Sequence, residues 1–215
     1  AVREYLLTIL NSNYEEWRAE HPLASIDDFD FSTEKMSSSG ALFDLDKLND
    51  VSKDTLVRIP AEELRVFLLS WSREFRPELA HFFEENPAYI RSILDLGRTG
   101  DKPRKDFIYA DQIFSFISYF FDEYFRIEDR LPENAAADAK EILSEYLDGY
   151  RHSDDQSEWF AKIRAIAENL GYAAKPKDFK KNPELYKGHV GDVSTVIRIA
   201  LMGRAQSPDV WEIQQ

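Results

Sequence analysis

The sequence predicts an all-α fold made of two helical bundles. Apolar side chains recur with the spacing of one helix face in several segments, and no window of comparable length alternates strictly between apolar and polar residues. Glycine, proline and capping residues stand where such segments would begin or end. A sheet therefore has little support, and we expect roughly nine or ten helices.

The segment 106–125 carries the clearest helical pattern. Its apolar residues follow the i, i+3/i+4, i+7 spacing of one helix face, and they are Ile113, Phe116, Ile117, Phe120, Phe121 and Tyr124. Asp111, Asp122 and Glu123 interrupt the apolar run well short of the roughly 20 residues that a bilayer span needs. We therefore expect a core helix.

Three further segments are amphipathic in the same way, namely 61–72 (Leu64, Phe67, Leu68, Trp71), 139–150 (Ile142, Leu143, Tyr146, Leu147, Tyr150) and 159–170 (Trp159, Ile163, Ile166, Ala167, Leu170). Residues at their ends and at neighbouring positions suit helix termini. Pro60 and Pro87 fit first-turn positions, Asn86 fits an N-cap, Asp155 with Glu158 fits a capping box, and Gly171 fits the position after a C-cap.

Two stretches predict irregular structure. Residues 20–43 contain Pro22, several acidic residues and the triplet Ser37–Ser39, and residues 97–106 combine two glycines and a proline with four basic groups. The second stretch is the better candidate for a domain boundary. We expect one helical domain over 1–105 and a second over 106–215.

The composition excludes several classes of protein. The 215 residues are 43% apolar, which is ample for a packed core, and the absence of cysteine excludes disulfide frameworks and thiolate chemistry. Neither a signal-like start nor a long apolar run is present, so we expect a cytoplasmic protein without a membrane partner. The net charge of −13 requires any contact with nucleic acid to be local.

No catalytic or metal-binding pattern is present in the sequence. The histidines at 21, 81, 152 and 189 share no ligand spacing, and HExxH, Walker and GxSxG motifs are absent. The run Lys35–Ser39 is similar to the Lys-Met-Ser-Lys-Ser loop that holds ATP phosphates, but Ser38 replaces the second lysine. A flexible serine-rich loop is the simpler interpretation, and we assign no catalytic residue, metal ligand or cofactor site to this chain.

The positive charge is concentrated near the C-terminus. Residues 175–204 hold seven basic and three acidic residues, a net charge of +4, whereas the remaining residues carry −17. A smaller basic cluster comprises Arg98, Lys102, Arg104 and Lys105. Segregated charge of this kind fits a surface that faces a polyanion, although lysine-rich loops are also commonly just solvated.

The segment 188–213 predicts two fixed arginines. Val193, Ile197, Ala200 and Leu201 form a narrow apolar stripe, with Arg198 just off it and Gly203 ending the helix, so that Arg204 falls in a turn. Ser207 and Pro208 then suit the N-cap and first position of another helix, with Asp209 in its first turn. Fixed guanidinium groups can read unpaired RNA bases, or they can pair with neighbouring carboxylates.

Three stretches together resemble a known family, the bacterial glutamyl-tRNA synthetases of the clostridial type. They are 39–48 (SGALFDLDKL), 158–171 (EWFAKIRAIAENLG) and 196–204 (VIRIALMGR) with Ser207-Pro208, the last being the most specific. The resemblance spans roughly residues 5–213. Val196 departs from the family's proline, Lys35-Met36 precede the serines, and the loop 172–188 looks longer than usual.

The resemblance implies a tRNA-binding part of an aminoacyl-tRNA ligase. Residues 1–105 would correspond to the stem-contact domain and 106–215 to the anticodon-binding domain, trimmed at its C-terminus. A Rossmann catalytic domain, absent from this chain, would use ATP and Mg²⁺ to attach glutamate to tRNA. The fragment alone is expected to be inactive, and its expected partners are tRNA and its own catalytic domain.

The family motif assigns candidate tRNA contacts residue by residue. Arg198 and Arg204 would lie on the tRNA surface with Lys187 and His189 as weaker companions, and Lys180 and Lys181 would contact phosphates. The choice between glutamate tRNA alone and glutamate plus glutamine tRNA stays open. The competing hypothesis is an all-α protein-interaction or regulatory module of related ancestry, without tRNA contact.

Overall fold

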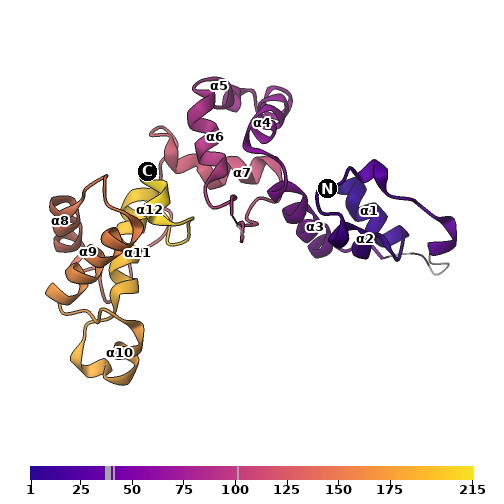
Figure 1. The fold of residues 1–215 in the computed structure, drawn as a ribbon. Helices are drawn as coiled ribbons and strands as arrows, with labels where there is room; N and C mark the ends of the chain where they lie inside the picture. The colour runs from indigo at the N-terminus through magenta and orange to yellow at the C-terminus, as the bar shows by residue number, and fades with distance from the viewer. Residues whose placement is uncertain (37–39, 41, 101) are drawn as a thin grey trace. The chain divides into compact units, whose positions relative to one another are not determined.

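The computed structural model describes residues 1–36, 40, 42–100 and 102–215 of the chain. Within these ranges the protein forms twelve α-helices and five short 3-10 helices, and no β-strand (Figure 1). The all-α prediction is confirmed. The α-helices outnumber the nine or ten expected because short ones, such as α5 (Ala80–Glu84), are too brief to show a periodic apolar pattern.

The chain folds into two compact units, Ala1–Ser115 and Phe116–Gln215. The division into a stem-contact domain and an anticodon-binding domain near residue 105 concerns function, and it stays a prediction. The expected serine-rich loop falls mainly on residues 37–39, which lie outside the described residues.

The first unit contains seven α-helices, the last of which crosses its boundary. They are α1 (Val2–Leu10), α2 (Tyr14–Glu20), α3 (Leu45–Val57), α4 (Ala61–Phe75), α5, α6 (Pro87–Asp95) and α7 (Ala110–Ile117), with 3-10 helices η1 (Ile26–Asp28), η2 (Thr33–Lys35) and η3 (Pro77–Leu79). Helices α4, α5, α6 and α7 supply its main buried apolar residues, among them Leu64, Leu68, Phe83, Ile90, Leu94 and Ile113.

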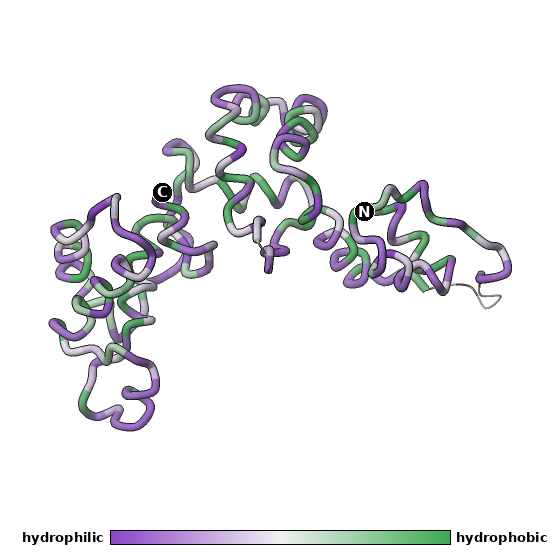
Figure 2. The backbone as a smooth tube through the Cα atoms, viewed as in Figure 1, coloured by the Kyte–Doolittle hydropathy of each residue, from purple (hydrophilic) through white to green (hydrophobic). Residues whose placement is uncertain are grey.

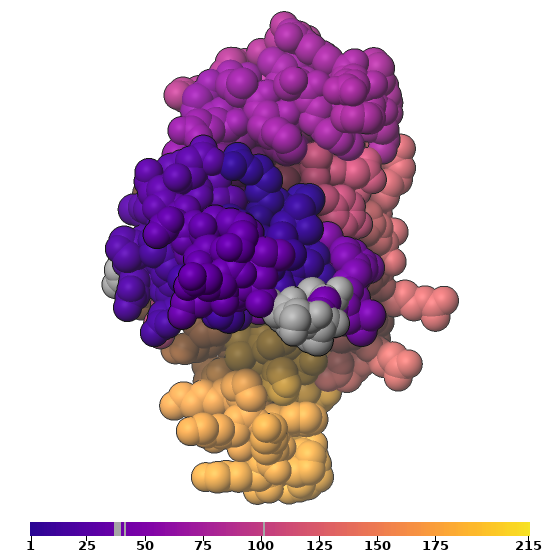
Figure 3. Space-filling model, turned by 90° about the vertical axis from the view of Figure 1, so that its right-hand side faces the viewer, coloured from indigo at the N-terminus to yellow at the C-terminus, as the bar shows by residue number. Residues whose placement is uncertain are grey.

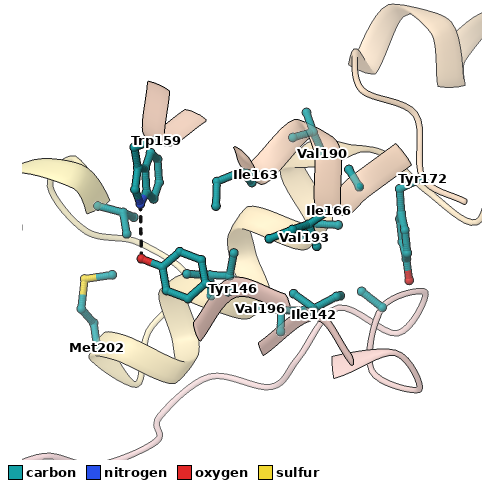
Figure 4. Packing of buried hydrophobic residues seen from close by; sticks show 14 residues of the cluster. Ile142, Tyr146, Trp159, Ile163, Ile166, Tyr172, Val190, Val193, Val196 and Met202 are labelled. Atoms are coloured by element: carbon teal, nitrogen blue, oxygen red, sulfur yellow. Dashed lines mark hydrogen bonds between the residues drawn. The ribbon is translucent and has the colours of Figure 1, made fainter. Parts of the chain in front are cut away.

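The second unit packs α8 (Ala139–Gly149), α9 (Gln156–Asn169) and α11 (Val190–Met202) around one core (Figure 4). Its smaller elements are η4 (Ser118–Phe120), α10 (Pro176–Lys181), η5 (Pro183–Leu185) and α12 (Val210–Ile213). Inside the core the indole Nε1 of Trp159 donates a hydrogen bond to the hydroxyl of Tyr146 at 3.2 Å. This bond satisfies the indole polar group among aliphatic neighbours.

The prediction of one long helix over 106–125 is wrong before residue 110 and beyond residue 117. Helix α7 ends at Ile117, the single 3-10 turn η4 follows, and Phe121 has an extended backbone. The aromatic run Tyr119–Phe121 loses side-chain freedom in a helix, which weakens helix propensity at this point. The pattern identified the buried residues Ile113 and Ile117 but not the end of the helix.

The helix-terminus predictions are confirmed where the motif is specific. Asp155 and Glu158 form a complete capping box at the start of α9, Gly171 follows the C-cap Leu170 with φ of +85°, and Pro87 is the first residue of α6. Asn86 precedes α6 as its N-cap, but with a left-handed backbone and no capping bond from its side chain.

Two terminus predictions are wrong. Pro60 is the N-cap of α4 and not a first-turn residue. Helix α12 begins at Val210 because the Asp209 carboxylate, not Ser207, accepts the capping bonds from Trp211 and Glu212. A carboxylate is a strong N-cap acceptor, so it sets the start of the helix two residues later than Ser207 would.

Some predicted apolar faces are also too wide. Leu147 of α8 and Phe67 of α4 are exposed, and so are Ala200 and Leu201 of α11, whose buried residues instead include Val190, Val196 and Met202. The two predicted irregular stretches, 20–43 and 97–106, are confirmed in their described parts. Apart from residue 20, which ends α2, they contain only short 3-10 helices, turns, bends and unstructured backbone.

Candidate nucleic-acid interface

The lysine-rich segment between α9 and α11 is a loop closed at its base. The Ala173 amide donates to the Gly188 carbonyl at 3.0 Å, and the Val190 amide donates to the Ala173 carbonyl at 2.8 Å, which makes an isolated parallel bridge between Ala173 and His189. Two backbone bonds across the base fix the points where the loop leaves and rejoins the bundle. Residues 174–188, referred to here as the basic loop, therefore project from a rigid base (Figure 1).

Close packing at the base requires a glycine and a buried tyrosine. A Cβ at Gly188 would lie 2.3 Å from Nδ2 of Asn134, so no larger residue fits without a shift. Tyr172 is almost fully buried, and its hydroxyl lies 2.9 Å from both the Asn134 carbonyl and the Asp138 carboxylate, so that it can donate its one proton to either. The loop base is thereby tied to the segment that precedes α8.

The tip of the basic loop presents lysines to solvent. Lys175, Lys177, Lys180 and Lys181 are all exposed, and in the described part of the chain none of them forms an ion pair. Lys180 and Lys181 occupy the last turn of α10, where the helix dipole favours positive charge. The residues of this segment are largely hydrophilic (Figure 2). In the space-filling view the segment protrudes from the rest of its unit (Figure 3).

Lys187 is held differently from the lysines at the tip. Its Nζ pairs with Oδ2 of Asp138 at 2.6 Å and lies 5.8 Å from the ring centroid of Tyr172. The hydrogen bond from Lys187, followed by that from Tyr172, lowers the pKa of Asp138 below its ordinary value. Lys187 thus stabilises the loop base, although half of its side chain stays accessible.

His189 has a structural position as the N-cap of α11. Its ring Nδ1 accepts the Gly191 amide at 2.9 Å, and its own amide donates to the Asp192 carboxylate at 2.8 Å, which completes a capping box. The ring also contacts Phe179 edge-on, with 5.8 Å between ring centroids. His189 therefore lies beside the basic loop, but its Nδ1 is already occupied by the hydrogen bond from the Gly191 amide.

The other predicted residues lie at the opposite end of α11. Gly203 ends the helix with φ of +73°, and Arg204 follows in the turn, where its Nη2 donates to Oε1 of Glu128 at 2.8 Å and to the hydroxyl of Ser118 at 3.2 Å. Arg198 reaches the same turn through a long 3.4 Å bond from Nη1 to the Ala205 carbonyl. Both arginines are partly buried.

A short segment, 126–129, clamps this turn. The amides of Glu128 and Asp129 both donate to the Gly203 carbonyl, at 2.8 and 3.1 Å, and the Asp129 carboxylate accepts the Ala205 amide at 2.7 Å. The Arg126 carbonyl lies so close that a Cβ at residue 203 would be 1.9 Å from it. Only glycine fits, and the clamp fixes the backbone that carries Arg204.

The six predicted residues therefore fall into two groups and not into one cluster. Lys180, Lys181, Lys187 and His189 lie on or beside the basic loop, whereas Arg198 and Arg204 meet at the clamped turn. Helix α11 separates the groups by about 20 Å, since it has 13 residues at a rise of about 1.5 Å each.

Sequence reasoning missed the acidic residues that organise both groups. Asp138 binds Lys187 and Tyr172, while Glu128 and Asp129 bind the turn after α11. Each is 34 to 76 residues away from its partner along the chain. No local spacing rule links such positions, so a single sequence holds no signal for them.

Comparison with known proteins identifies relatives of the whole chain. No family model matches it. Over its full length the chain is 62% identical to the glutamate–tRNA ligase of Acetivibrio thermocellus and 43% identical to that of Clostridium beijerinckii, and it covers 40% of each relative. Over 98% of its length it is 38% identical to the glutamate–tRNA ligase of Sorangium cellulosum.

The chain is homologous to a segment of the glutamate–tRNA ligases. It spans about two fifths of the length of these ligases, which are class I aminoacyl-tRNA synthetases. The family resemblance noted in the sequence is thereby confirmed. Among the described residues no helix is long and apolar enough to cross a membrane, and no three His, Asp or Glu side chains gather as a metal site would require.

Proposed function

We propose that this chain is the tRNA-binding part of a glutamate–tRNA ligase. The observation that carries the proposal is the basic loop. It exposes four lysines that form no ion pair within the described residues, on a chain of net charge −13 that is homologous to these ligases. Lysines that find no acidic partner in an acidic protein favour a polyanion as their partner. The name of the homologous ligases, glutamate–tRNA ligase, states that they act on tRNA.

The two groups of residues have different roles in this proposal. Lys180 and Lys181, with Lys187 and His189 nearby, contact phosphates and set the register of the RNA, since lysine is a mobile point charge. Arg198 and Arg204 act at the clamped turn, where planar guanidinium groups on fixed backbone can stack on or hydrogen-bond to unpaired bases. A separation of about 20 Å lets the groups contact nucleotides several positions apart.

The proposal also divides the chain by function. Residues 106–215 bind the anticodon arm, and residues 1–105 contact the inner stem. Attachment of glutamate, with ATP and Mg²⁺, belongs to the part of the ligase that this chain does not span.

A titration with tRNA at several salt concentrations tests the proposal. We expect micromolar or tighter binding of glutamate tRNA that weakens steeply with salt, because each neutralised phosphate releases counterions. Glutamine tRNA in a parallel titration reports whether the anticodon is discriminated. No binding to either tRNA at low salt would contradict the proposal and favour the protein-interaction module.

A further inference from the structure

Helix α1 carries an apolar stripe that stays exposed in the described part of the first unit. Val2, Leu6 and Leu10 are spaced four residues apart and so share one face, and their exposed fractions are 61%, 44% and 36%. The buried residue of the helix, Tyr5, lies on a different face and is 2% exposed. A helix of this kind has one face for its own core and a second for another partner.

A second apolar element lies next to this helix. The Asp44 amide donates to the Tyr5 hydroxyl at 2.7 Å, and the Phe43 ring packs edge-on against the Tyr5 ring with 5.7 Å between centroids. These contacts hold Phe43 beside α1 while its side chain stays exposed, as do those of its neighbours Leu42 and Leu45. Three exposed apolar side chains on one face of α1, with the exposed Phe43 held against the same helix, exceed the scattered single hydrophobic residues of an ordinary surface.

The chemistry of this surface excludes nucleic acid as its partner. The cation within α1 is Arg3, and its Nη2 is paired with Asp27 at 2.6 Å. Glu4, on the polar side of the helix, is held by Arg18 at 3.2 Å and Arg58 at 2.9 Å. The charges of α1 are thus compensated within the unit, so the exposed aliphatic side chains fit an apolar protein surface and not a phosphate backbone.

The length of the relatives indicates which protein surface this is. The chain aligns over its full length with ligases of which it covers 40%, so about three fifths of each relative lies outside the matched segment. We propose that Val2, Leu6, Leu10 and Phe43 pack against that remaining part of the same ligase. This inference rests on the proposed function, and it makes α1 the contact through which the tRNA-binding part is attached to the rest of the enzyme.

Hydrogen exchange of α1 tests the inference in the full-length ligase that contains this chain. We expect the α1 amides to exchange about tenfold or more slowly in the full-length protein than in the chain alone, because docking suppresses local opening. Leu6→Glu should remove this protection. The matched control is Leu147→Glu on α8, which changes an equally apolar residue that is 72% exposed and should leave α1 protected.

Two results would overturn the inference. Equal exchange of α1 in the full-length protein and in the chain alone would show that the rest of the ligase does not cover the stripe. Protection that rises with the concentration of the isolated chain would assign the stripe to a second copy instead. Because Leu6→Glu lies outside the basic loop, its tRNA titration reports separately on the proposed function.

Discussion

Arg204 and Glu128 form an ion pair across 76 residues of sequence, with 2.8 Å between Nη2 and Oε1. The Arg204 side chain is mostly buried, whereas half of the Glu128 side chain is exposed. The same Nη2 also reaches the Ser118 hydroxyl, so Arg204 is oriented from two sides. An arginine held in this way contributes geometry as well as charge, which is the property that base recognition requires.

Arg204→Lys separates geometry from charge. Lysine keeps the positive charge but loses the planar fork, so we expect tRNA binding to weaken by about 1–3 kcal/mol if Arg204 contacts a base. The salt dependence should stay nearly unchanged, because the number of charges facing the RNA is the same. Titrations of wild type and variant with glutamate tRNA at three salt concentrations measure both quantities. Unchanged affinity would contradict base recognition by Arg204.

Lys180→Ala removes a phosphate contact. Affinity should fall evenly for glutamate and glutamine tRNA, and the slope of log K against log salt should flatten by about one. Lys140→Ala is the matched control, because Lys140 is an exposed lysine of α8 outside the basic loop. An equal change of slope in both variants would show that binding depends on overall charge and not on the loop.

Gly203→Ala tests the clamp around the turn after α11. The φ of +73° and the approach of the Arg126 carbonyl leave no room for a Cβ, so we expect the free energy of unfolding to fall by more than about 2 kcal/mol. Gly149→Ala is the control, since a Cβ there meets no atom within 4 Å and alanine favours helix, which should keep the change within about 1 kcal/mol. Urea denaturation followed by circular dichroism measures both, and similar stabilities would contradict the clamp.

The fold class and much of the second bundle could be predicted from the sequence, because helix faces and caps are local signals. The Asp155–Glu158 capping box and the glycines 171 and 203 lie within a few residues of the termini they define. The end of α7 could not be predicted in this way. The apolar spacing continues past Ile117, but the α-helix ends there, and the low helix propensity of the aromatic run Tyr119–Phe121 leaves no mark in that spacing.

The candidate site was predicted only as far as its basic residues. Local charge identified Lys180 and Lys181, and the arginine motif came from the family resemblance. The acidic residues Asp138, Glu128 and Asp129 act through contacts between distant segments, which only the folded chain brings together. Their roles in holding lysine and arginine side chains could therefore be identified only from the structure.

Asp138→Asn gives a prediction that depends on pH. Asp138 is the N-cap residue of α8, yet its side chain makes no capping bond and instead accepts from Lys187 and Tyr172. These bonds lower the pKa of Asp138 below its ordinary value of 3.8. The folded state thus binds this proton less readily than the unfolded state, so the carboxylate stabilises the fold above about pH 4 and this contribution is lost as pH falls below that value.

We therefore expect Asp138→Asn to lower the free energy of unfolding by about 1 kcal/mol at pH 7, since the pair is partly exposed and solvent weakens it. The difference from wild type should shrink as pH falls below about 4, because the unfolded state then takes up the proton first, and it should vanish only below the lowered pKa of the folded state. Asp148→Asn controls for the loss of one negative charge, because Asp148 is exposed on the same helix and its carboxylate makes no bond within the described residues. Urea denaturation at pH 7, 5 and 3 measures the three proteins. A difference that is the same at every pH would show that the Lys187 and Tyr172 contacts act through packing, because a contribution from the ionised carboxylate must vanish once that group is protonated.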